Sequence, residues 1–567
     1  MIRLPLRSAP RSILLGAALL TGCAAGGSPG GGSSTAEPAG AFGPYLAGRF
    51  AASQADAAAA TQQFSEALDR DPDQPEVVAQ AFGAAVMGGG SEASRLARRL
   101  PSDQLAELLL AGSDAQAGRW DRAEQRLRTL PRRGAAQILQ PLLIAWTQAG
   151  HGNTDNALGL LRPFIEDPRL RGLASLHAAM IADLGGRPAE ALRYARAALA
   201  DSRDPNLRLV QIAAGIFARA GQEADGARLF DVMAAGQDDI AIVATPAVRQ
   251  AALRGRAVAS ATEGMAEAEV TLGAALRTQG APELSLMLSR LALRLRPNFT
   301  PAILLAADAL ADQSHPEAAL ATLDTAPADD GFAPLVALRR ASLLNAAGRA
   351  DEAQALLRRL AETRPDAVQP YARLGDMMRA AGRYDEAVAA YGQALQRLRP
   401  GSGNGWSLYY ARGIALERAG QWPEAEAAFQ QALTLSPDQP YVLNYLAYTW
   451  AERGERLPEA RRMLERAAQA RPTDGNIADS LGWVMFRQGD LSGAVKALER
   501  AAEIDPRNAT VNDHLGDAYW SVNRRTEARY QWRRALDLDP SAQDAARLDA
   551  KLRDGLQPSA ATAAATR

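Results

Sequence analysis

The amino-acid sequence predicts an all-α protein, in which helix–turn–helix repeats stack into a right-handed superhelical solenoid with two halves. The first observation is a period near 34 residues over residues 406–540, which is typical of stacked helix pairs. The second is a composition with 47% apolar and only 5% aromatic residues, which suits close helix packing better than a sheet core. The third is that the same kinds of residue return in each repeat: Gly413, Gly420, Ala425, Phe429, Ala432 and Pro437, then Gly482, Gly489, Ala494, Leu498, Ala501 and Pro506, then Gly516, Asn523, Ala528, Trp532, Ala535 and Pro540.

Each repeated position has a mechanical role in a pair of helices. Small residues such as Gly413 and Ala425 stand where the two helices cross most closely, and large ones such as Leu416 and Phe429 fill the groove beside the crossing. Pro437 ends the second helix, because a helix cannot continue through proline. This pattern resembles the tetratricopeptide repeat, and the resemblance implies a superhelix whose concave face is lined by the first helix of each unit.

The first residues have the features of a bacterial export signal. Arg3, Arg7 and Arg11 form a basic stretch, and residues 13–20 are apolar but too few to span a bilayer. Cys23 follows, and the segment resembles a lipoprotein signal, which implies that residues 1–22 are a signal peptide and that Cys23 is the site of lipid attachment. Several acyl chains on Cys23 would anchor the protein without spanning the membrane. The alternative is an ordinary secretory signal with an incidental cysteine.

The residues after Cys23 bear on the membrane and on the link to it. Ala24 stands where an aspartate would retain a lipoprotein in the inner membrane, so the family sorting rule implies the outer membrane, with the protein on its periplasmic face. An inner-membrane lipoprotein is the alternative. Residues 23–40 are rich in Gly, Ser and Pro, and we expect them to form a flexible tether.

The repeat spacing divides the rest of the chain into four segments. Residues 41–236 are predicted to form an N-terminal, degenerate repeat array. The period then fails, because the turn positions Gly221 and Gly280 are 59 residues apart. We therefore expect an irregular break at 237–265 with one extra helix near 248–258, and a regular C-terminal array over 266–540. Residues 541–567 are predicted to be a capping helix and a disordered tail, since a terminal repeat needs a polar cover.

The sequence does not predict an enzyme. His151, His177, His315 and His514 are scattered over different repeats without the spacing of metal ligands, and no catalytic or phosphate-loop motif is present. Cys23 is the single cysteine. We expect no catalytic residue, metal, cofactor or small-molecule substrate, and only turnover or saturable glycan binding would favour an enzyme or a carbohydrate receptor. A net charge of -1 argues against nucleic acid as a partner.

The predicted function is binding of a protein partner along the concave groove. Counting from Gly413, Ala447, Gly482 and Gly516 as position eight of each unit places aromatic, amide and charged side chains on this face. Rigid aromatic surface holds an extended peptide at low entropic cost. The alternative is that these rings pack only between neighbouring repeats. The predicted partner-binding residues are Tyr410, Arg418, Tyr441, Asn444, Tyr445, Tyr448, Asn476, Asp479, Trp483, Phe486, Arg487, Asp513, Asp517 and Trp520.

The C-terminal repeats resemble a particular group of proteins. Residues 444–448 (NYLAY), 479–483 (DSLGW) and 514–516 (HLG), together with the lipoprotein signal, are similar to large lipid-anchored tetratricopeptide proteins of Gram-negative bacteria. One group among these acts as an outer-membrane adaptor that brings periplasmic carboxyl-terminal processing proteases to peptidoglycan hydrolases, so the resemblance implies a scaffold of this kind. The alternative is an assembly or export factor for a secretin, a pilus, a polysaccharide exporter or the barrel-assembly machinery. The carboxylate clamp of tetratricopeptide co-chaperones is not expected, because Lys496 and Lys551 fall outside the groove positions.

Overall fold

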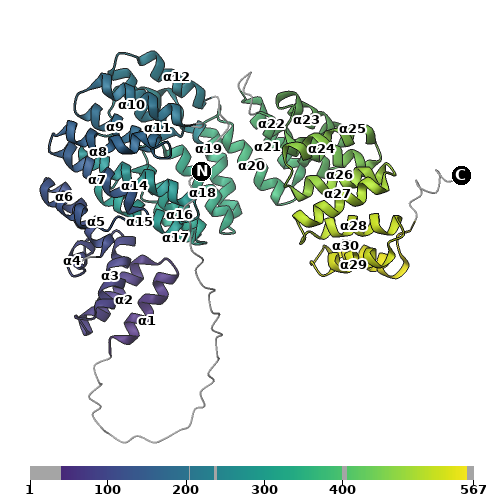
Figure 1. Cartoon of the computed structure of the whole chain (residues 1–567), viewed down its shortest axis with the longest axis horizontal. Helices are drawn as coiled ribbons and strands as arrows, with labels where there is room; N and C mark the ends of the chain where they lie inside the picture. Colours follow the sequence, from purple (N-terminus) through teal and green to yellow (C-terminus); the bar gives the residue numbers. More distant parts are fainter. Residues whose placement is uncertain (1–39, 102, 203–204, 235–238, 399–404, 558–567) are drawn as a thin grey trace, which may run out of the picture. The chain divides into compact units, whose positions relative to one another are not determined.

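The structure, a computed structural model, describes residues 40–101, 103–202, 205–234, 239–398 and 405–557 (Figure 1). Every regular element in these residues is a helix, so the all-α prediction is confirmed. Within the same residues, no helix is both long and apolar enough to cross a bilayer. The predicted signal peptide 1–22, the lipid attachment site Cys23, the tether up to residue 39 and the tail from residue 558 lie outside the described residues.

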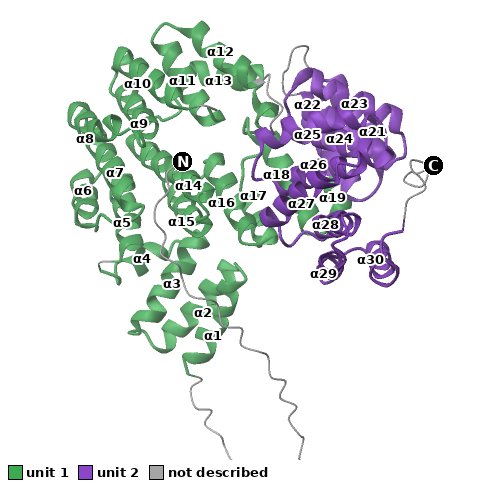
Figure 2. Cartoon of the chain, turned by 45° about the vertical axis from the view of Figure 1, so that its right-hand side comes forward, with its two compact units in different colours: residues 1–234, 240–353 green, residues 235–239, 354–567 purple. Residues whose placement is uncertain are grey.

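Two compact units make up the chain (Figure 2). Unit 1 comprises residues 1–234 and 240–353, and unit 2 comprises residues 235–239 and 354–567. The 3-10 helix η1 (Asp239–Val243) and helix α19 (Ala350–Thr363) run across the two divisions. The other helices of unit 1 are α1 (Phe42–Ser53), α2 (Ala57–Arg70), α3 (Pro75–Met87), α4 (Ala93–Ala97), α5 (Gln104–Gln116), α6 (Trp120–Thr129), α7 (Ala136–Gly150), α8 (Thr154–Glu166), α9 (Arg171–Leu184), α10 (Pro188–Asp201), α11 (Leu207–Arg219), α12 (Glu223–Ala234), α13 (Pro246–Arg254), α14 (Ala261–Thr278), α15 (Pro282–Leu295), α16 (Thr300–Asp312), α17 (Pro316–Leu323) and α18 (Ala333–Ala346). Those of unit 2 are α20 (Gln369–Ala380), α21 (Tyr384–Gln396), α22 (Trp406–Arg418), α23 (Trp422–Leu435), α24 (Pro440–Arg453), α25 (Leu457–Ala470), α26 (Gly475–Arg487), α27 (Leu491–Ile504), α28 (Ala509–Ser521), α29 (Arg525–Leu536) and α30 (Ala542–Asp554).

Consecutive helices pack as pairs, with a small residue facing a large one where they cross. In the α22–α23 pair, a Cβ atom added to Gly413 would lie 2.6 Å from the ring of Phe429. In the α26–α27 pair, a Cβ atom added to Gly482 would lie 2.6 Å from the side chain of Leu498. Phe429 and Leu498 are fully buried, so a larger residue opposite either would push the helices apart. The pairwise packing predicted from the repeated small residues is therefore confirmed.

The turns and helix starts follow from local chemistry. Gly420, in the turn between α22 and α23, has a φ of +78°, which costs glycine little because it has no Cβ atom. Asn523 takes the same place between α28 and α29 with a φ of 65°, and asparagine tolerates this region better than most residues. Asp474 begins α26, where its carboxylate accepts the backbone N–H groups of Asn476 and Ile477 at 3.1 and 3.2 Å.

Helices α14 and α15 lie against the first helices of the preceding pairs in unit 1, as Figures 1 and 2 both show. Helix α14 packs on α5, α7 and α9, and α15 packs on α3 and α5. The approach of α14 to α7 is close, because a Cβ atom added to Gly264 would lie 2.4 Å from the indole of Trp146, which is fully buried. The first helices of these pairs therefore face the chain's own α14 and α15.

The sequence predicts an irregular break with one extra helix between two halves at residues 237–265. Helix α13, at residues 246–254, overlaps the expected extra helix, and α14 begins at Ala261. The compact units divide after Ala353, so residues 266–353 belong to unit 1 instead of forming one array with the residues that follow. The reason is the packing of α14 and α15 on the earlier helices, a tertiary contact that the repeat period does not record.

Candidate partner-binding groove

The first helices α22, α24 and α26 of unit 2 are joined by polar contacts from each helix to the next. The hydroxyl of Tyr445 on α24 donates to a carboxylate oxygen of Glu417 on α22 at 3.1 Å. The indole N–H of Trp483 on α26 donates to the carboxylate of Glu452 on α24. Because each bond spans two successive units, it fixes an aromatic side chain on the face that the first helices share.

An aromatic cluster covers α22 and α24. The ring of Tyr410 lies 6.0 Å from that of Phe429 and 5.9 Å from that of Tyr445, in an edge-to-face arrangement with the latter. Tyr445 itself lies 5.2 Å from Phe429, the buried residue at the crossing with α23. Burial raises the pKa of both tyrosines, and with the neighbouring Glu417 carboxylate it raises that of Tyr445 to about 12. Tyr410 and Tyr445 thus pack between and within repeats, as the alternative to groove binding describes.

A second aromatic group continues onto α26 and α28. The indole of Trp483 stacks on Phe486 at 5.1 Å and on the imidazole of His514 at 4.1 Å, each with planes 13° apart. His514 Nδ1 lies 3.0 Å from both carboxylate oxygens of Asp479. Burial alone would lower the pKa of His514, but the carboxylates around it, Asp479 foremost, raise it above the usual value. A protonated imidazole also gains from lying over the indole face.

The three predicted acidic groove residues are buried and have internal partners. Asp479 is 5% exposed and pairs with His514 on α28. Asp513, 3% exposed, accepts from Arg547 at 2.9 Å and from Lys551 at 2.6 Å, both on α30. Asp517, 4% exposed, accepts from Lys551 at 2.8 Å, and burial raises its pKa although Lys551 acts in the opposite direction. These carboxylates tie α26, α28 and α30 together.

Three predicted residues on α24, unlike the acidic residues, take no part in ion pairs. Tyr441 is 39% exposed, with the Arg471 guanidinium 5.2 Å above its ring. The side-chain oxygen of Asn444 is buried and has no hydrogen-bond partner. The ring of Tyr448 lies 6.5 Å from the imidazole of His514, and burial raises the pKa of its hydroxyl. Residues three and four positions apart share a helix face, so these three side chains form one row along α24.

The other four predicted residues each have a partner within the chain. Arg418 and Asn476 are exposed, and Arg487 and Trp520 are half-buried. Arg418 lies 3.7 Å from Glu417, Asn476 accepts from Asn508 at 3.1 Å, Arg487 donates to the backbone oxygen of Glu452 at 3.2 Å, and Trp520 has the guanidinium of Arg525 4.0 Å above its ring. These contacts hold the side chains in place at the edges of the face.

Several residues that build this face were missed by the sequence analysis. His514 stands at position six of its unit, the position that Tyr445 has in an earlier one, so the same count could have found it. The roles of Glu417 and Glu452 could not be predicted from the sequence, because a glutamate on a helix is usually a solvent-exposed residue. Lys551 on α30 lies outside the repeats, and only the structure shows that it reaches α28.

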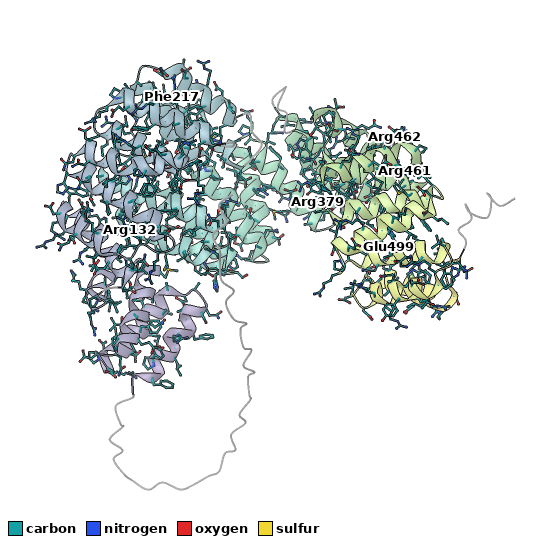
Figure 3. All side chains as sticks on the ribbon, viewed as in Figure 1. Arg132, Phe217, Arg379, Arg461, Arg462 and Glu499 are labelled. Carbon is teal, nitrogen blue, oxygen red and sulfur yellow. The ribbon has the colours of Figure 1, made fainter. Side chains whose placement is uncertain are left out.

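The second helices carry ion pairs, and two of the side chains labelled in Figure 3, Arg461 and Glu499, take part in them. Arg461 on α25 lies 3.0 Å from the carboxylates of Glu465 and Asp490. Glu499 on α27 accepts the hydroxyl of Tyr519 at 2.7 Å and pairs with Arg524. Exposed pairs of this kind contribute little to stability and keep the surface solvated.

The chemistry available to the described residues is that of a binding surface. Among them, no group of three or more His, Cys, Asp or Glu side chains is arranged to hold a metal ion. His177 in unit 1 is fully buried, which lowers its pKa to about 3, and its Nδ1 accepts the indole N–H of Trp146 at 3.1 Å. That histidine is therefore neutral and structural.

Comparisons with known proteins agree with the repeat architecture. Models described as tetratricopeptide repeat match residues 366–438 and 410–475, and a model described as TPR repeat matches residues 482–523. A curated relative, the TPR repeat-containing protein PA4667 of Pseudomonas aeruginosa, is 30% identical over 180 residues. That alignment covers 30% of this chain, and the chain spans 30% of the relative's length.

Solved helical-repeat structures are also similar to the chain. MamA from Desulfovibrio magneticus RS-1 is 19% identical, with 30% of this chain and 94% of that chain covered and a TM-score of 0.27. YrrB, titled a TPR protein with an unusual peptide-binding site, is 20% identical over 34% of this chain and 97% of its own, with a TM-score of 0.28. The Cut9–Hcn1 structure is 14% identical over 91% and 96%, with a TM-score of 0.38. Residues 366–475 and 482–523, with the paired helices that they contain, therefore match the tetratricopeptide repeat.

Proposed function

We propose that this protein is a lipid-anchored scaffold on the periplasmic face of the outer membrane, and that it holds an extended segment of a protein partner against α24. The observation that supports this most directly is the row of Tyr441, Asn444 and Tyr448. It combines an exposed aromatic ring, a half-buried amide whose oxygen has no partner and a half-buried phenol. An extended peptide offers N–H donors, carbonyl acceptors and side chains at this spacing, so it can satisfy all three groups at once.

The partner's identity is proposed from the sequence resemblance. The lipoprotein signal at Cys23 and the motifs at residues 444–448 and 479–483 favour an adaptor for a periplasmic carboxyl-terminal processing protease or a peptidoglycan hydrolase. The half-buried aromatic rings of α22, α24 and α26 support peptide binding in general, since such rings supply most of the energy of many interfaces. An assembly or export role would use the same face with a different partner.

The test is crosslinking in intact cells, followed by purification of the full-length protein and mass spectrometry. We expect the double variant Asn444→Ala, Tyr448→Phe to capture about tenfold less of a processing protease or wall hydrolase, because it removes two hydrogen-bonding groups and little packing. Tyr530→Ala on α29 is the matched control, because Tyr530 is 77% exposed and lies away from the first helices. Equal capture by the double variant would contradict the proposed face, and capture of secretin or pilus components would contradict the proposed partner.

Membrane attachment has its own test. If Cys23 carries the lipid, Cys23→Ser releases the protein from the membrane fraction to the soluble periplasm, as cell fractionation would show. The Ala24→Asp variant, which keeps Cys23, should move from the outer to the inner membrane under the sorting rule that the resemblance implies. A Cys23→Ser protein that stays with the membranes would contradict the anchor.

A further inference from the structure

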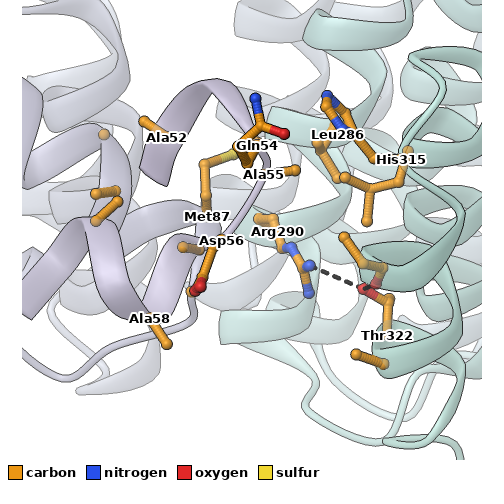
Figure 4. A pocket seen from close by; sticks show the side chains of 18 of the residues that line it. Ala52, Gln54, Ala55, Asp56, Ala58, Met87, Leu286, Arg290, His315 and Thr322 are labelled. Carbon is orange, nitrogen blue, oxygen red and sulfur yellow. Dashed lines mark hydrogen bonds between the residues drawn. The ribbon is translucent and has the colours of Figure 1, made fainter. Parts of the chain in front are cut away.

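A cavity of about 760 Å³ lies in unit 1, between the α1–α2 turn and α3 on one side and α15 to α17 on the other (Figure 4). Its walls are formed largely by short or aliphatic side chains, such as Ala55, Ala58, Met87, Leu286 and Leu310. Proteins hold small molecules in cavities of about 300–1,000 Å³, so this one is large enough for a small organic ligand.

One basic side chain points into the cavity. Figure 4 shows the guanidinium of Arg290, which extends from α15 toward α17. Its Nη2 atom donates to the Thr322 hydroxyl at 3.0 Å, and its Nε atom is buried without a hydrogen-bond partner. No carboxylate of the described residues forms an ion pair with it. Burial lowers the pKa of Arg290, as expected for a cation removed from water without an anion nearby.

The acidic residues that line the cavity are engaged elsewhere. The carboxylate of Asp56 accepts the backbone N–H of Ala59 at 2.9 Å and so caps the start of α2. Glu317 has a side chain that is 68% exposed, and it lies 3.4 Å from Arg349. Neither acid compensates Arg290, so the cavity has an unpaired guanidinium among mainly apolar walls.

We propose that this cavity binds a monocarboxylate on a small, mainly apolar body, with the Arg290 guanidinium holding the carboxylate. The planar guanidinium matches a carboxylate in charge and shape, and Thr322 holds it in place through Nη2. A single arginine balances one negative charge, which favours a carboxylate over a phosphate dianion. Arg290 lies on the second helix of its pair, so this site is separate from the face of α24 and does not depend on the function proposed for it.

Two sources carry this chemistry, a free short-chain acid and the C-terminus of a peptide. Butyrate and N-acetyl-trialanine are suitable probes, each compared by calorimetry with its uncharged amide on the full-length protein. We expect the acids to bind and the amides to bind at least about tenfold more weakly, because a charged hydrogen-bonded pair is lost. Tighter binding of butyrate assigns the site to small acids, and tighter binding of the peptide assigns it to chain termini.

Variants separate a binding role of Arg290 from a structural one. Arg290→Gln should weaken acid binding at least about tenfold, whereas Arg95→Gln, at an arginine that is 63% exposed, should leave it unchanged. Arg290→Met should abolish binding and raise the melting temperature, because it replaces a buried unpaired charge with an apolar side chain of similar length. The proposal is overturned if neither acid shows saturable binding, if Arg290→Gln binds as well as wild type, or if Arg290→Met melts at a lower temperature.

Discussion

Burial of the His514 imidazole between the Trp483 indole and the Asp479 carboxylate gives this side chain two contacts that strengthen on protonation. The surrounding carboxylates raise its pKa, so the folded chain binds this proton more tightly than the unfolded chain. Protonated His514 therefore stabilises unit 2 fully below its unfolded pKa of about 6.5, and this stability is lost as pH rises through the higher folded pKa.

At the residue scale we therefore expect the melting temperature of unit 2 to fall as pH is raised above about 6.5. Calorimetry from pH 6 to 8 should show this decline in wild type and a weaker one in His514→Gln. His151→Gln, at a histidine beside Asp121 on unit 1, is the control. The same slope in the His514→Gln protein would show that His514 is not the group that titrates.

The same residues show how far sequence can reach at this scale. The repeat count placed Tyr441, Asn444 and Tyr448 on the first helix of their unit, and the structure places them in one row along α24. It also placed Asp513 and Asp517 on the first helix of theirs, but could not show that α30 buries them. Position in a repeat is a local property, whereas burial depends on which distant helix covers the position.

At the scale of helix pairs, the crossing of α22 and α23 depends on the absence of a side chain at Gly413. Gly413→Ala would place a methyl group 2.6 Å from the ring of Phe429, which Tyr410 holds from another side at 6.0 Å. We expect a loss of about 1–3 kcal/mol in the free energy of unfolding of unit 2. Gly392→Ala in α21 is the matched control, with no atom within 4 Å of the added Cβ, and should gain about 0.5–1 kcal/mol. Urea unfolding measures both, and equal effects would contradict a steric role for Gly413.

Helix α30 is held to α28 by charge as well as by packing. Lys551 bonds Asp513 at 2.6 Å and Asp517 at 2.8 Å, and all three side chains are largely buried. Lys551→Ala would leave buried carboxylates without this partner, so we expect a loss of about 3–5 kcal/mol in the stability of unit 2. The exposed Lys496 on α27 provides the control, since Lys496→Ala should change stability by less than about 0.5 kcal/mol. Partial recovery of the Lys551→Ala protein at acidic pH, where Asp517 is protonated, would support the charge argument; a small, pH-independent loss would contradict it.

At the scale of the whole molecule, the repeat period predicted the helix pairs but not how they group. Small residues at fixed spacing dictate that two neighbouring helices cross closely, and this information is local. The packing of α14 and α15 on α3, α5, α7 and α9 joins segments separated by several other helices in the sequence, and no period encodes it. For this reason the break in spacing at 237–265 was taken for a boundary, whereas the compact units divide after Ala353.

Helix α14 contacts several first helices of unit 1. A change that displaces α14 should therefore destabilise all of these helices together. Gly264→Ala would place a methyl group 2.4 Å from the fully buried Trp146 indole, so α14 could not keep its present position. We expect hydrogen exchange to accelerate throughout α3 to α15, while the helices of unit 2 keep their protection. Gly159→Ala in α8, where nothing lies within 4 Å of the added Cβ, should leave exchange in unit 1 unchanged or slower. Acceleration confined to α7 and α14 would mean that unit 1 is stabilised pair by pair, as in a simple repeat array, and that α14 does not unite it.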